Sequence, residues 1–485
     1  MLFSSYTFLF AFLPLVLVGW WGLKGKNARL AFLTLASWVF YGWWDWRFVP
    51  LLIASTALNY VAGIAIARTT DADRRRILLA TSISINVALL GYFKYSGFFV
   101  DSLQGLGSTL GLPVDLPRID VLLPIGISFY TFISISYTVD VYRGSIEATR
   151  NFLEYSTFVG GFAHLIAGPI LRFGEVSEQL RRPPMRLTSH FAMMGLFFLG
   201  CGLVKKVLIA DRLAPSVDFL FSDPSDLGLV TAWAAAIGYS LQLYFDFSGY
   251  SDMAVGCAWL LGFRYPQNFN SPYRAVSVTD FWTRWHMTLS RWLRDYLFFP
   301  LARRYATGSS LGAGRRERLG TYACLFLTMA IAGLWHGAAW TFVVWGAMHG
   351  VALASERAYR DHRRLAGLPA RPPSTTRKAV HRVATFVFVV VGFSVFRSPS
   401  LGAAGEVLSS MLGVHGVESL GQLENLLTAQ FVALLAILLV FVNAVPNTWQ
   451  IKVAPRVRYG LALGTATAIA IMSIAELHTF IYFQF

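Results

Sequence analysis

The sequence predicts an all-α, polytopic transmembrane protein, and three observations support this fold class. The 485 residues are 55 % hydrophobic and only 14 % charged, with a mean hydropathy of +0.53, whereas an average soluble domain is about 25 % charged. The apolar residues gather in long blocks such as TFLFAFLPLVLVGWWGL (7–23), and a helix needs roughly 20 mostly apolar residues to cross the hydrocarbon layer. Short basic connections separate these blocks.

The charge distribution predicts the orientation in the membrane. Four connections are rich in Lys and Arg: KGKNAR (24–29), RTTDADRRR (68–76), RRYATGSSLGAGRRER (303–318) and the stretch Arg357–Arg382. Because cytoplasmic loops carry an excess of Lys and Arg, these connections are expected in the cytoplasm, where they can also contact anionic membrane lipids. Topology therefore explains the formal net charge of +15, and no nucleic-acid partner is expected.

The first apolar block, 7–23, is expected to be a membrane span and not a cleaved secretory signal. No basic residue precedes it, no small-x-small cleavage site follows it, and its positive flank lies on the C-terminal side. The N-terminus is therefore expected outside the cytoplasm. Further candidate spans follow at 30–45, 49–67, 77–99, 119–139, 189–210, 228–246, 249–263, 319–335, 337–355, 380–396, 428–445 and 458–475. Residues 1–485 contain no apparent internal repeat, and we expect a single transmembrane domain.

Two segments in the middle of the chain do not have the pattern of simple membrane crossings. NFLEYSTFVGGFAHLIAGPILRF (151–173) is apolar but interrupted by two glycine-containing pairs, and FWTRWHMTLSRWLRDYLFFPL (281–301) is amphipathic. Irregular backbone at membrane depth persists only where protein or a water-filled cavity satisfies its polar groups. We therefore expect re-entrant or interfacial helices here, arranged around a cavity.

The segment 281–301 is predicted to be helical, beginning at the S-x-x-D capping pattern Ser277–Asp280. An apolar stripe recurs at spacings of three and four residues: Phe281, Trp285, Leu289, Trp292, Leu293 and Tyr296. Polar residues share another face, and His286 lies at the edge between the two faces. Spacing alone allows either an interfacial helix with a solvated polar face or a functional His286.

Several enzyme classes lack their signatures in this chain. There is no G-x-x-x-x-G-K-[ST], no G-x-S-x-G, no His three or four residues from another, and no H-x-x-x-x-D. No metal site is expected. The three cysteines, Cys201, Cys257 and Cys324, lie in apolar segments without a CxxC pair, so buried thiols and no disulfide are expected.

His336 lies among apolar and small residues in AGLWHGAAWTFVVWGAMHG (332–350). Since the connections on both sides of 319–355 are expected in the cytoplasm, this region must leave and return, with His336 at the turn. A low dielectric favours neutral imidazole, which is a suitable general base for a hydroxyl. A buried histidine that only hydrogen-bonds a neighbouring helix is the alternative, and position alone leaves both open. His349 lies about three and a half turns further along the returning helix.

Longer motifs resemble the membrane-bound O-acyltransferase (MBOAT) family, in the bacterial branch that O-acetylates exopolysaccharides such as alginate. LWHGA (334–338) and RWHMTLSRWLRDYL (284–297) carry this resemblance most strongly. It continues through MLFSSYTFLFAFLPLVL, LPIGISFYTFISISYTVDVYRG, LIAGPILRF, LYFDFSGYSDMAVG, NFNSPYRA and FIYFQF. GFAHLIAGP and PLARRYATG depart from the family pattern; they leave both histidine motifs intact and concern only the identity of the polymer.

The resemblance implies an MBOAT fold with a central tunnel in the bacterial inner membrane. It implies that His336 is catalytic and takes the proton of an acceptor hydroxyl as this attacks a thioester carbonyl. His286 is implied as the second catalytic histidine, at the donor entrance, and His349 is expected to pack against or support the site. No bound cofactor is implied: acetyl-CoA or another acetyl thioester is the cytoplasmic donor, and a periplasmic acetyltransferase is the expected partner for transfer to the exopolysaccharide.

Tyr482, in the C-terminal FIYFQF (480–485), is a candidate acyl relay that His336 would deprotonate, or an aromatic anchor at the membrane interface. A transporter or polysaccharide exporter with His336, His286 and Asp246 as a proton relay is the alternative function. The missing internal repeats and the two histidine motifs speak against it. A further alternative is an O-acyltransferase that acts on a lipid or a protein.

Overall fold

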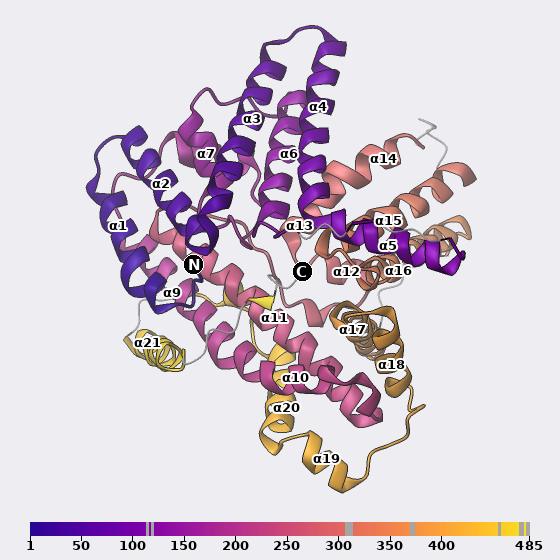
Figure 1. The fold of residues 1–485 in the computed structure, drawn as a ribbon. Helices are drawn as coiled ribbons and strands as arrows, with labels where there is room; N and C mark the ends of the chain where they lie inside the picture. Colours follow the sequence, from indigo (N-terminus) through magenta and orange to yellow (C-terminus); the bar gives the residue numbers. More distant parts are fainter. Residues whose placement is uncertain are drawn as a thin grey trace. The chain divides into compact units, whose positions relative to one another are not determined.

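The computed structural model describes residues 1–112, 116–117, 121–305, 314–368, 374–453, 457–474 and 480–481. Within these residues every regular element is a helix, which confirms the predicted all-α class (Figure 1). Five helical stretches are long and apolar enough to cross a membrane: Lys26–Arg68, Ala72–Thr109, Ser189–Ser222, Arg315–His336 and Thr375–Arg397. Shorter apolar helices lie at Thr7–Gly22, Ala429–Ala444 and Val457–Met472. The chain is a multi-pass membrane protein.

The described chain clusters into two compact units, and the single transmembrane domain expected from the sequence stays a prediction. The first unit contains residues 1–204, 250–266 and the C-terminal segment from Val453, and the second contains 205–249 and 267–452. Helix α11 (Leu229–Leu260) begins in the second unit and ends in the first. The sequence analysis divided this region into spans at 228–246 and 249–263. That division is wrong, because Gly249 is accommodated inside one continuous helix of 32 residues.

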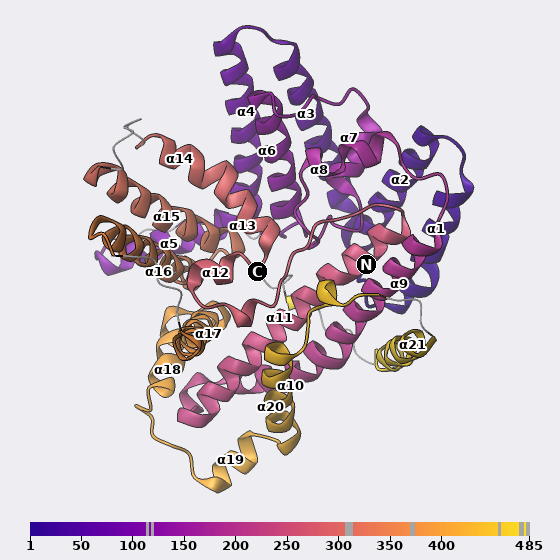
Figure 2. The same ribbon diagram turned by 180° about the vertical axis from the view of Figure 1, so that it is seen from behind.

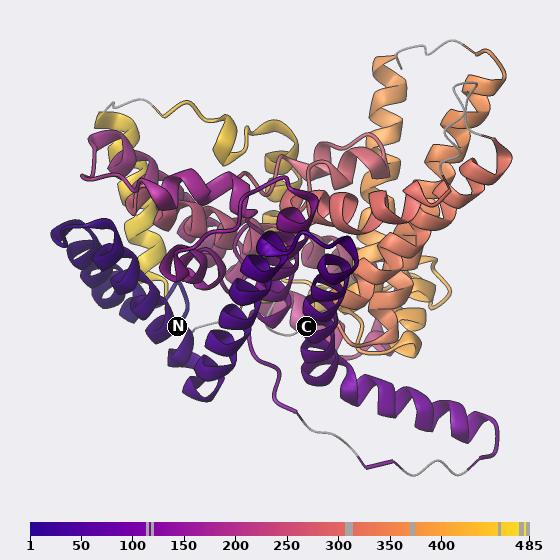
Figure 3. The same ribbon diagram turned by 90° about the horizontal axis from the view of Figure 1, so that it is seen from above.

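The described residues of the first unit form ten α-helices besides the end of α11: α1 (Leu13–Gly22), α2 (Lys26–Asp45), α3 (Val49–Arg68), α4 (Ala72–Leu90), α5 (Ser96–Thr109), α6 (Ile127–Arg143), α7 (Phe152–Gly160), α8 (Phe173–Arg181), α9 (Ser189–Leu203) and α21 (Val457–Met472). A π-helical turn, Thr7–Phe12, leads into α1. Figure 3 shows α5 leaving the end of α4 at an angle. Helix α7 ends at Gly160, where the sequence predicts a break.

Helices α3, α4 and α6 run side by side (Figures 1 and 2). Asn59 on α3 and Asn86 on α4 exchange side-chain hydrogen bonds of 2.8 and 3.2 Å, and Ser82 donates to Asn59 at 3.0 Å. Gly63 lets α3 approach α6, since a Cβ there would lie 2.5 Å from the ring of Tyr137. Polar pairs and small residues at helix contacts are how membrane helices associate, because lipid tails provide no hydrophobic drive between helices.

The second unit contains α10 (Asp211–Ser222), the short helices α12 (Val278–Trp282), α13 (Met287–Leu293) and α14 (Phe299–Arg303), the long helices α15 (Arg315–His336), α16 (Trp340–Leu365) and α17 (Thr375–Arg397), and α18 (Leu401–Met411), α19 (Leu420–Leu426) and α20 (Ala429–Ala444). Helices α17 and α18 pack against each other (Figure 2). None of the three cysteines, all of which lie in the described residues, forms a disulfide, and Cys257 and Cys324 are buried as predicted. Cys201 is only half-buried.

Candidate active site

Helices α15 and α16 form a tight antiparallel hairpin, and His336 is the last residue of α15. Glycines make this approach possible: a Cβ on Gly333 would lie 2.1 Å from the carbonyl oxygen of Phe342, and one on Gly346 would lie 2.3 Å from that of Met329. The three residues after His336 form the turn. The hairpin turn predicted from loop charges is therefore present, and His336 is buried at its tip with 4 % of its surface exposed.

Aromatic rings connect three histidines of the second unit. The His336 ring lies 5.0 Å from Trp335 and 5.2 Å from Trp345, centroid to centroid. Trp335 lies 6.4 Å from the ring of His286, and Trp345 lies 4.9 Å from the ring of His349. His336 is thus separated from each of the other two histidines by one tryptophan. We call His286, His336, His349, Trp335 and Trp345 the histidine cluster.

His286 interrupts the helix that the sequence predicts across 281–301. Its backbone is left-handed, with φ of 42°, and it is the N-cap of α13, so α12 and α13 are separate helices. The segment 268–270 causes the break: the carbonyl of Asn268 accepts from Met287 N at 2.9 Å, and Asn270 N donates to Arg284 O at 2.8 Å. The continuous helix is a wrong prediction, because side-chain spacing cannot reveal this competing backbone pairing. Ser277 does cap α12: its hydroxyl oxygen accepts from the backbone N–H of Asp280 at 3.0 Å.

Asn268 fixes the orientation of the fully buried His286. Its Oδ1 lies 3.2 Å from His286 Nδ1, and it also accepts from the backbone N–H of Thr288 at 3.3 Å and from its hydroxyl at 2.9 Å. A backbone N–H can only donate, so the Asn268 atom at this position is the oxygen. Nδ1 must then carry the proton, which leaves the lone pair on Nε2. Phe247 packs edge-on against the same imidazole at 4.8 Å.

His349 is enclosed by aromatic side chains. It is fully buried, its Nδ1 accepts from the indole N–H of Trp282 at 3.2 Å, and its ring packs against Trp282 at 5.3 Å and Phe388 at 5.1 Å. An imidazole that accepts at Nδ1 carries its proton on Nε2. Glu356, seven residues further along α16, accepts from the backbone N–H groups of Val278 and Thr279 at 2.6 and 3.0 Å. The carboxylate holds α12, and with it Trp282, on α16.

Asp246 on α11 lies in a buried ion cluster. Lys206 Nζ lies 2.7 Å from Asp246 Oδ1 and 2.7 Å from Asp211 Oδ1, and Asp246 and Lys206 are 1 % and 4 % exposed. Because unpaired charges are costly to bury, removing either partner would destabilise this region. The cluster gives Asp246 a structural role, and a relay role for it stays a prediction. Tyr482 lies outside the described residues; nearby, Phe480 is buried and stacks on Tyr250 at 4.5 Å within the first unit.

A basic cavity of about 460 Å³ lies beside the break at His286, between the end of α12 and the start of α13. Trp282 and Met287 line it together with Arg291, Arg294, Arg357 and Arg360, and the remaining lining residues are Thr279, Thr283, Ser290, Phe298, Thr321, Leu325 and Leu353. Among the described residues no acidic side chain lines it, although Asp295 pairs with Arg294 at 2.8 Å and Asp361 with Arg357 at 3.1 Å. Such a lining favours an anionic ligand with phosphate groups.

Sequence patterns identify some, but not all, of the residues that build this cluster. His286, His336 and His349 were candidates, and the structure brings all three together. Asn268, Trp335, Trp345 and Glu356 were missed. Asn268 lies in NFNSPYRA, which was noted as a motif. Nothing in its spacing shows that its amide oxygen contacts an imidazole 18 positions later.

Comparison with known proteins identifies relatives over most of the chain. The model of the MBOAT, membrane-bound O-acyltransferase family, matches residues 119–401. The probable alginate O-acetylase AlgI of Azotobacter vinelandii is 44 % identical over 422 residues, which cover 85 % of this chain and 78 % of that protein. A peptidoglycan O-acetyltransferase of Helicobacter pylori is 36 % identical, covering 86 % and 81 %. A teichoic acid D-alanyltransferase of Bacillus subtilis is 28 % identical, covering 56 % and 68 %.

The range matched by the family model contains the whole histidine cluster and Asn268. By their names, the three relatives act on alginate, peptidoglycan and teichoic acid, respectively.

Proposed function

The chain belongs to the membrane-bound O-acyltransferase family and is an O-acyltransferase, and from this premise we propose that it moves acetyl groups from a cytoplasmic thioester towards hydroxyls of an exopolysaccharide such as alginate. The observation that carries the proposal is the 44 % identity over 85 % of the chain to a probable alginate O-acetylase. The bacterial inner membrane is the proposed location, with the N-terminus outside. Family membership favours this function over the exporter alternative.

The proposed chemistry is acyl transfer with His336 as general base. The neutral imidazole takes the proton of the acceptor hydroxyl while that oxygen attacks the thioester carbonyl carbon. The tetrahedral intermediate then collapses: the C–S bond breaks, and the thiolate leaves with the proton from the imidazolium. The aromatic rings of Trp335, Trp345 and Phe396 around His336 exclude water, which would otherwise compete with the acceptor.

His286 is proposed to act beside the donor. With Nδ1–H held by Asn268, its Nε2 is set as an acceptor, so it can orient a hydroxyl or a bound water but cannot donate from that nitrogen. The two flanking residues of the break, Trp282 and Met287, line the basic cavity. We assign this cavity to the phosphate groups of the acetyl donor, acetyl-CoA or another acetyl thioester, because arginine forks match phosphate oxygens.

A periplasmic acetyltransferase is the proposed partner for the final transfer to the polymer. Tyr482 is the proposed acyl relay towards it, forming an aryl ester when its phenol oxygen replaces the thiolate on the acetyl carbonyl. A Tyr482→Phe chain that still acetylates the polymer at the wild-type level would remove the relay role. The same result would leave the acyl-transfer proposal for His336 intact.

The direct test in cells measures acetate on purified exopolysaccharide from strains that carry wild type, His336→Ala or His362→Ala. His362 is an exposed histidine on the same helix hairpin and is the matched control. We expect His336→Ala to lose polymer acetate at a normal protein level and His362→Ala to retain it. Unchanged acetate with a defect in polymer export would instead support the transporter alternative.

A further inference from the structure

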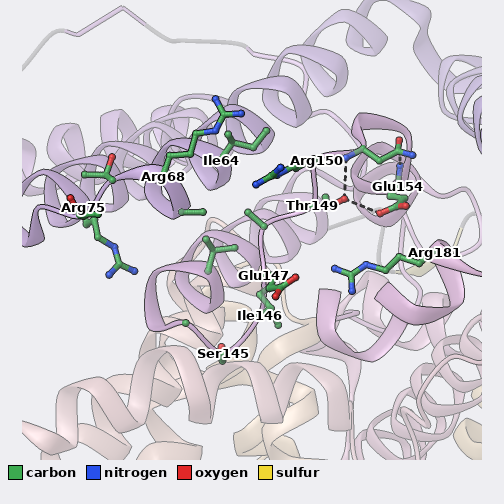
Figure 4. A pocket seen from close by; sticks show the side chains of 17 residues that line it. Ile64, Arg68, Arg75, Ser145, Ile146, Glu147, Thr149, Arg150, Glu154 and Arg181 are labelled. Atoms are coloured by element: carbon green, nitrogen blue, oxygen red, sulfur yellow. Dashed lines mark hydrogen bonds between the residues drawn. The ribbon is translucent and has the colours of Figure 1, made fainter.

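A second polar cavity, of about 1180 Å³, lies within the first unit and plays no part in the proposed reaction (Figure 4). Its walls are the turn that joins α3 to α4, the segment 144–151 that follows α6, and Arg181 at the end of α8. Figure 4 shows Arg68 and Arg75 on one side, Arg181 on the opposite side, and the segment containing Glu147 and Arg150 between them.

Arginines dominate the charge of this cavity. Arg68, Arg75, Arg150 and Arg181 line it, against two acidic residues, Glu147 and Glu154. Glu154 is already engaged, because its carboxylate contacts Lys26 Nζ at 2.8 Å and accepts from the Thr149 hydroxyl at 2.8 Å. The four guanidinium groups therefore have at most one lining carboxylate available to offset them.

These guanidinium groups are largely uncommitted to protein partners. Among the described residues, the side chains of Arg68, Arg150 and Arg181 form no ion pair, and the Glu147 carboxylate forms none either. Arg75 Nη2 donates to the carbonyl of Tyr142 at 2.8 Å, while its Nε is buried with no hydrogen-bond partner in the described residues. Like charges gathered in one cavity repel each other unless an anion binds between them. The arrangement is therefore that of a binding site and not of a network of structural ion pairs.

The other lining residues indicate the class of anion. The hydroxyl of Thr70 stands among the arginines, while those of Thr69 and Ser145 already donate to the carbonyls of Ala65 and Asp140 at 2.8 and 3.0 Å. Ile64, Val141 and Ile146 add apolar surface. Arginine forks with a hydroxyl donor match the oxygens of a phosphate group. Apolar surface beside such a group suits the glycerol and upper acyl chain of a lipid, and basic pockets between membrane helices are sites for anionic head groups.

We propose that this cavity binds a phosphate group, supplied by the head group of an anionic phospholipid such as phosphatidylglycerol. A soluble phosphate ester has the same recognition chemistry and is the other source. The lipid is the source we favour, because the cavity lies at the ends of two apolar helices, α3 and α4, that are joined by the basic connection 68–76.

The test uses the purified full chain in a neutral detergent and measures the thermal unfolding midpoint and, by native mass spectrometry, bound lipid. The probes are dioctanoyl phosphatidylglycerol, dioctanoyl phosphatidylcholine and glycerol 3-phosphate, each titrated separately. A ligand that binds only the folded state raises the midpoint, and the rise grows with the ligand concentration relative to its dissociation constant. We expect phosphatidylglycerol to raise it and to appear as a bound adduct, and phosphatidylcholine to do neither.

The diagnostic variant is Arg150→Gln/Arg181→Gln, and the matched control is Arg182→Gln, which changes the exposed neighbour that does not line the cavity. Loss of two charge-assisted contacts is expected to weaken phosphatidylglycerol binding on the order of tenfold or more. The control is expected to bind as wild type does. Because both variants change exposed side chains, the unliganded midpoint should be the same in all three proteins.

The outcomes separate the alternatives. Stabilisation by phosphatidylglycerol alone, lost in the double variant, supports the lipid site. Equal stabilisation by glycerol 3-phosphate, again lost in the double variant, retains the phosphate site but overturns the lipid source. Absence of any anion-dependent stabilisation, or the same stabilisation in wild type and double variant, overturns the proposal.

Discussion

His286 shows how a single side chain is positioned by partners that are distant in the sequence. Its left-handed backbone, the inserted segment 268–270 and the shared amide oxygen of Asn268 act together. A residue of this type in a left-handed conformation costs conformational free energy, which surrounding contacts must offset. The strain lies at His286 itself, a residue for which the family motif implies a catalytic role.

Removing the Asn268 side chain should therefore impair catalysis without unfolding the protein. In Asn268→Ala no side chain fixes which imidazole nitrogen of His286 carries the proton. We expect kcat to fall by roughly tenfold, as for a lost hydrogen bond of about 1–1.5 kcal/mol. Asn268→Asp restores an acceptor and should recover part of the rate. The measurements are kcat and KM of the purified chain across pH. An equal loss of kcat in both variants, with the same unfolding midpoint for each, would contradict a role in fixing the tautomer.

Glu418 controls stability at another single site. Its carboxylate accepts from Gly228 N at 3.1 Å, Val230 N at 3.0 Å, Thr231 N at 2.9 Å and the Thr231 hydroxyl, and so caps the start of α11. Burial acts to raise the pKa of Glu418, but the hydrogen bonds from Thr231 and the backbone outweigh burial and leave the pKa below its usual value. An anion at a helix N-terminus is also favoured by the helix dipole.

Glu418→Gln should lower the free energy of unfolding by about 1–2 kcal/mol, the range for a lost N-cap. Since the folded-state pKa lies below the unfolded one, the carboxylate stabilises the fold above pH 4.5 and loses that effect as the pH falls further. The unfolding midpoint in detergent at pH 7 and pH 4 measures both effects. Glu424→Gln, at an exposed position on α19, is the control. A variant as stable as wild type at pH 7 would contradict the capping role.

At the scale of elements, the α15–α16 hairpin depends on glycines at the helix crossing. Gly333→Ala would place a methyl group 2.1 Å from the backbone oxygen of Phe342, which cannot move as a flexible side chain could. We expect a loss of about 1–3 kcal/mol in stability, with lower activity because His336 shifts. Gly464→Ala, on α21 with open space around it, is the matched control. Equal midpoints and rates for the two variants would refute the close-packing account.

Element prediction from this sequence succeeds where one local cause decides and fails where distant segments compete. Loop charge alone places the turn at His336, and Gly160–Gly161 ends α7 as predicted. The prediction of a continuous helix at 281–301 is wrong, because a side-chain spacing of three and four residues does not reveal the backbone hydrogen bonds made by 268–270. The split of α11 is also wrong because of a distant partner: the predicted span ends at Asp246, but Lys206, far earlier in the chain, pairs with Asp246 and the helix continues.

At the scale of the whole molecule, the orientation predicted from the loop charges is testable by labelling. In a background without Cys201, Cys257 and Cys324, Asp226→Cys should react with a membrane-impermeant maleimide in intact cells. Arg76→Cys, which lies in a basic connection, should react only after the cells are opened. Both positions are exposed, so accessibility in the folded chain does not bias the comparison. The reverse pattern would show that the N-terminus lies in the cytoplasm.

The central claim is acyl transfer by His336, and the most direct measurement is release of free thiol from acetyl-CoA by the purified chain with a polysaccharide acceptor. The account predicts that His336→Ala lowers the acceptor-dependent rate by about 10²–10⁴-fold, the contribution of a general base, while His362→Ala keeps the wild-type rate. Both variants should share the unfolding midpoint of the wild type within a few degrees. A folded His336→Ala chain that releases thiol at the wild-type rate would contradict the account.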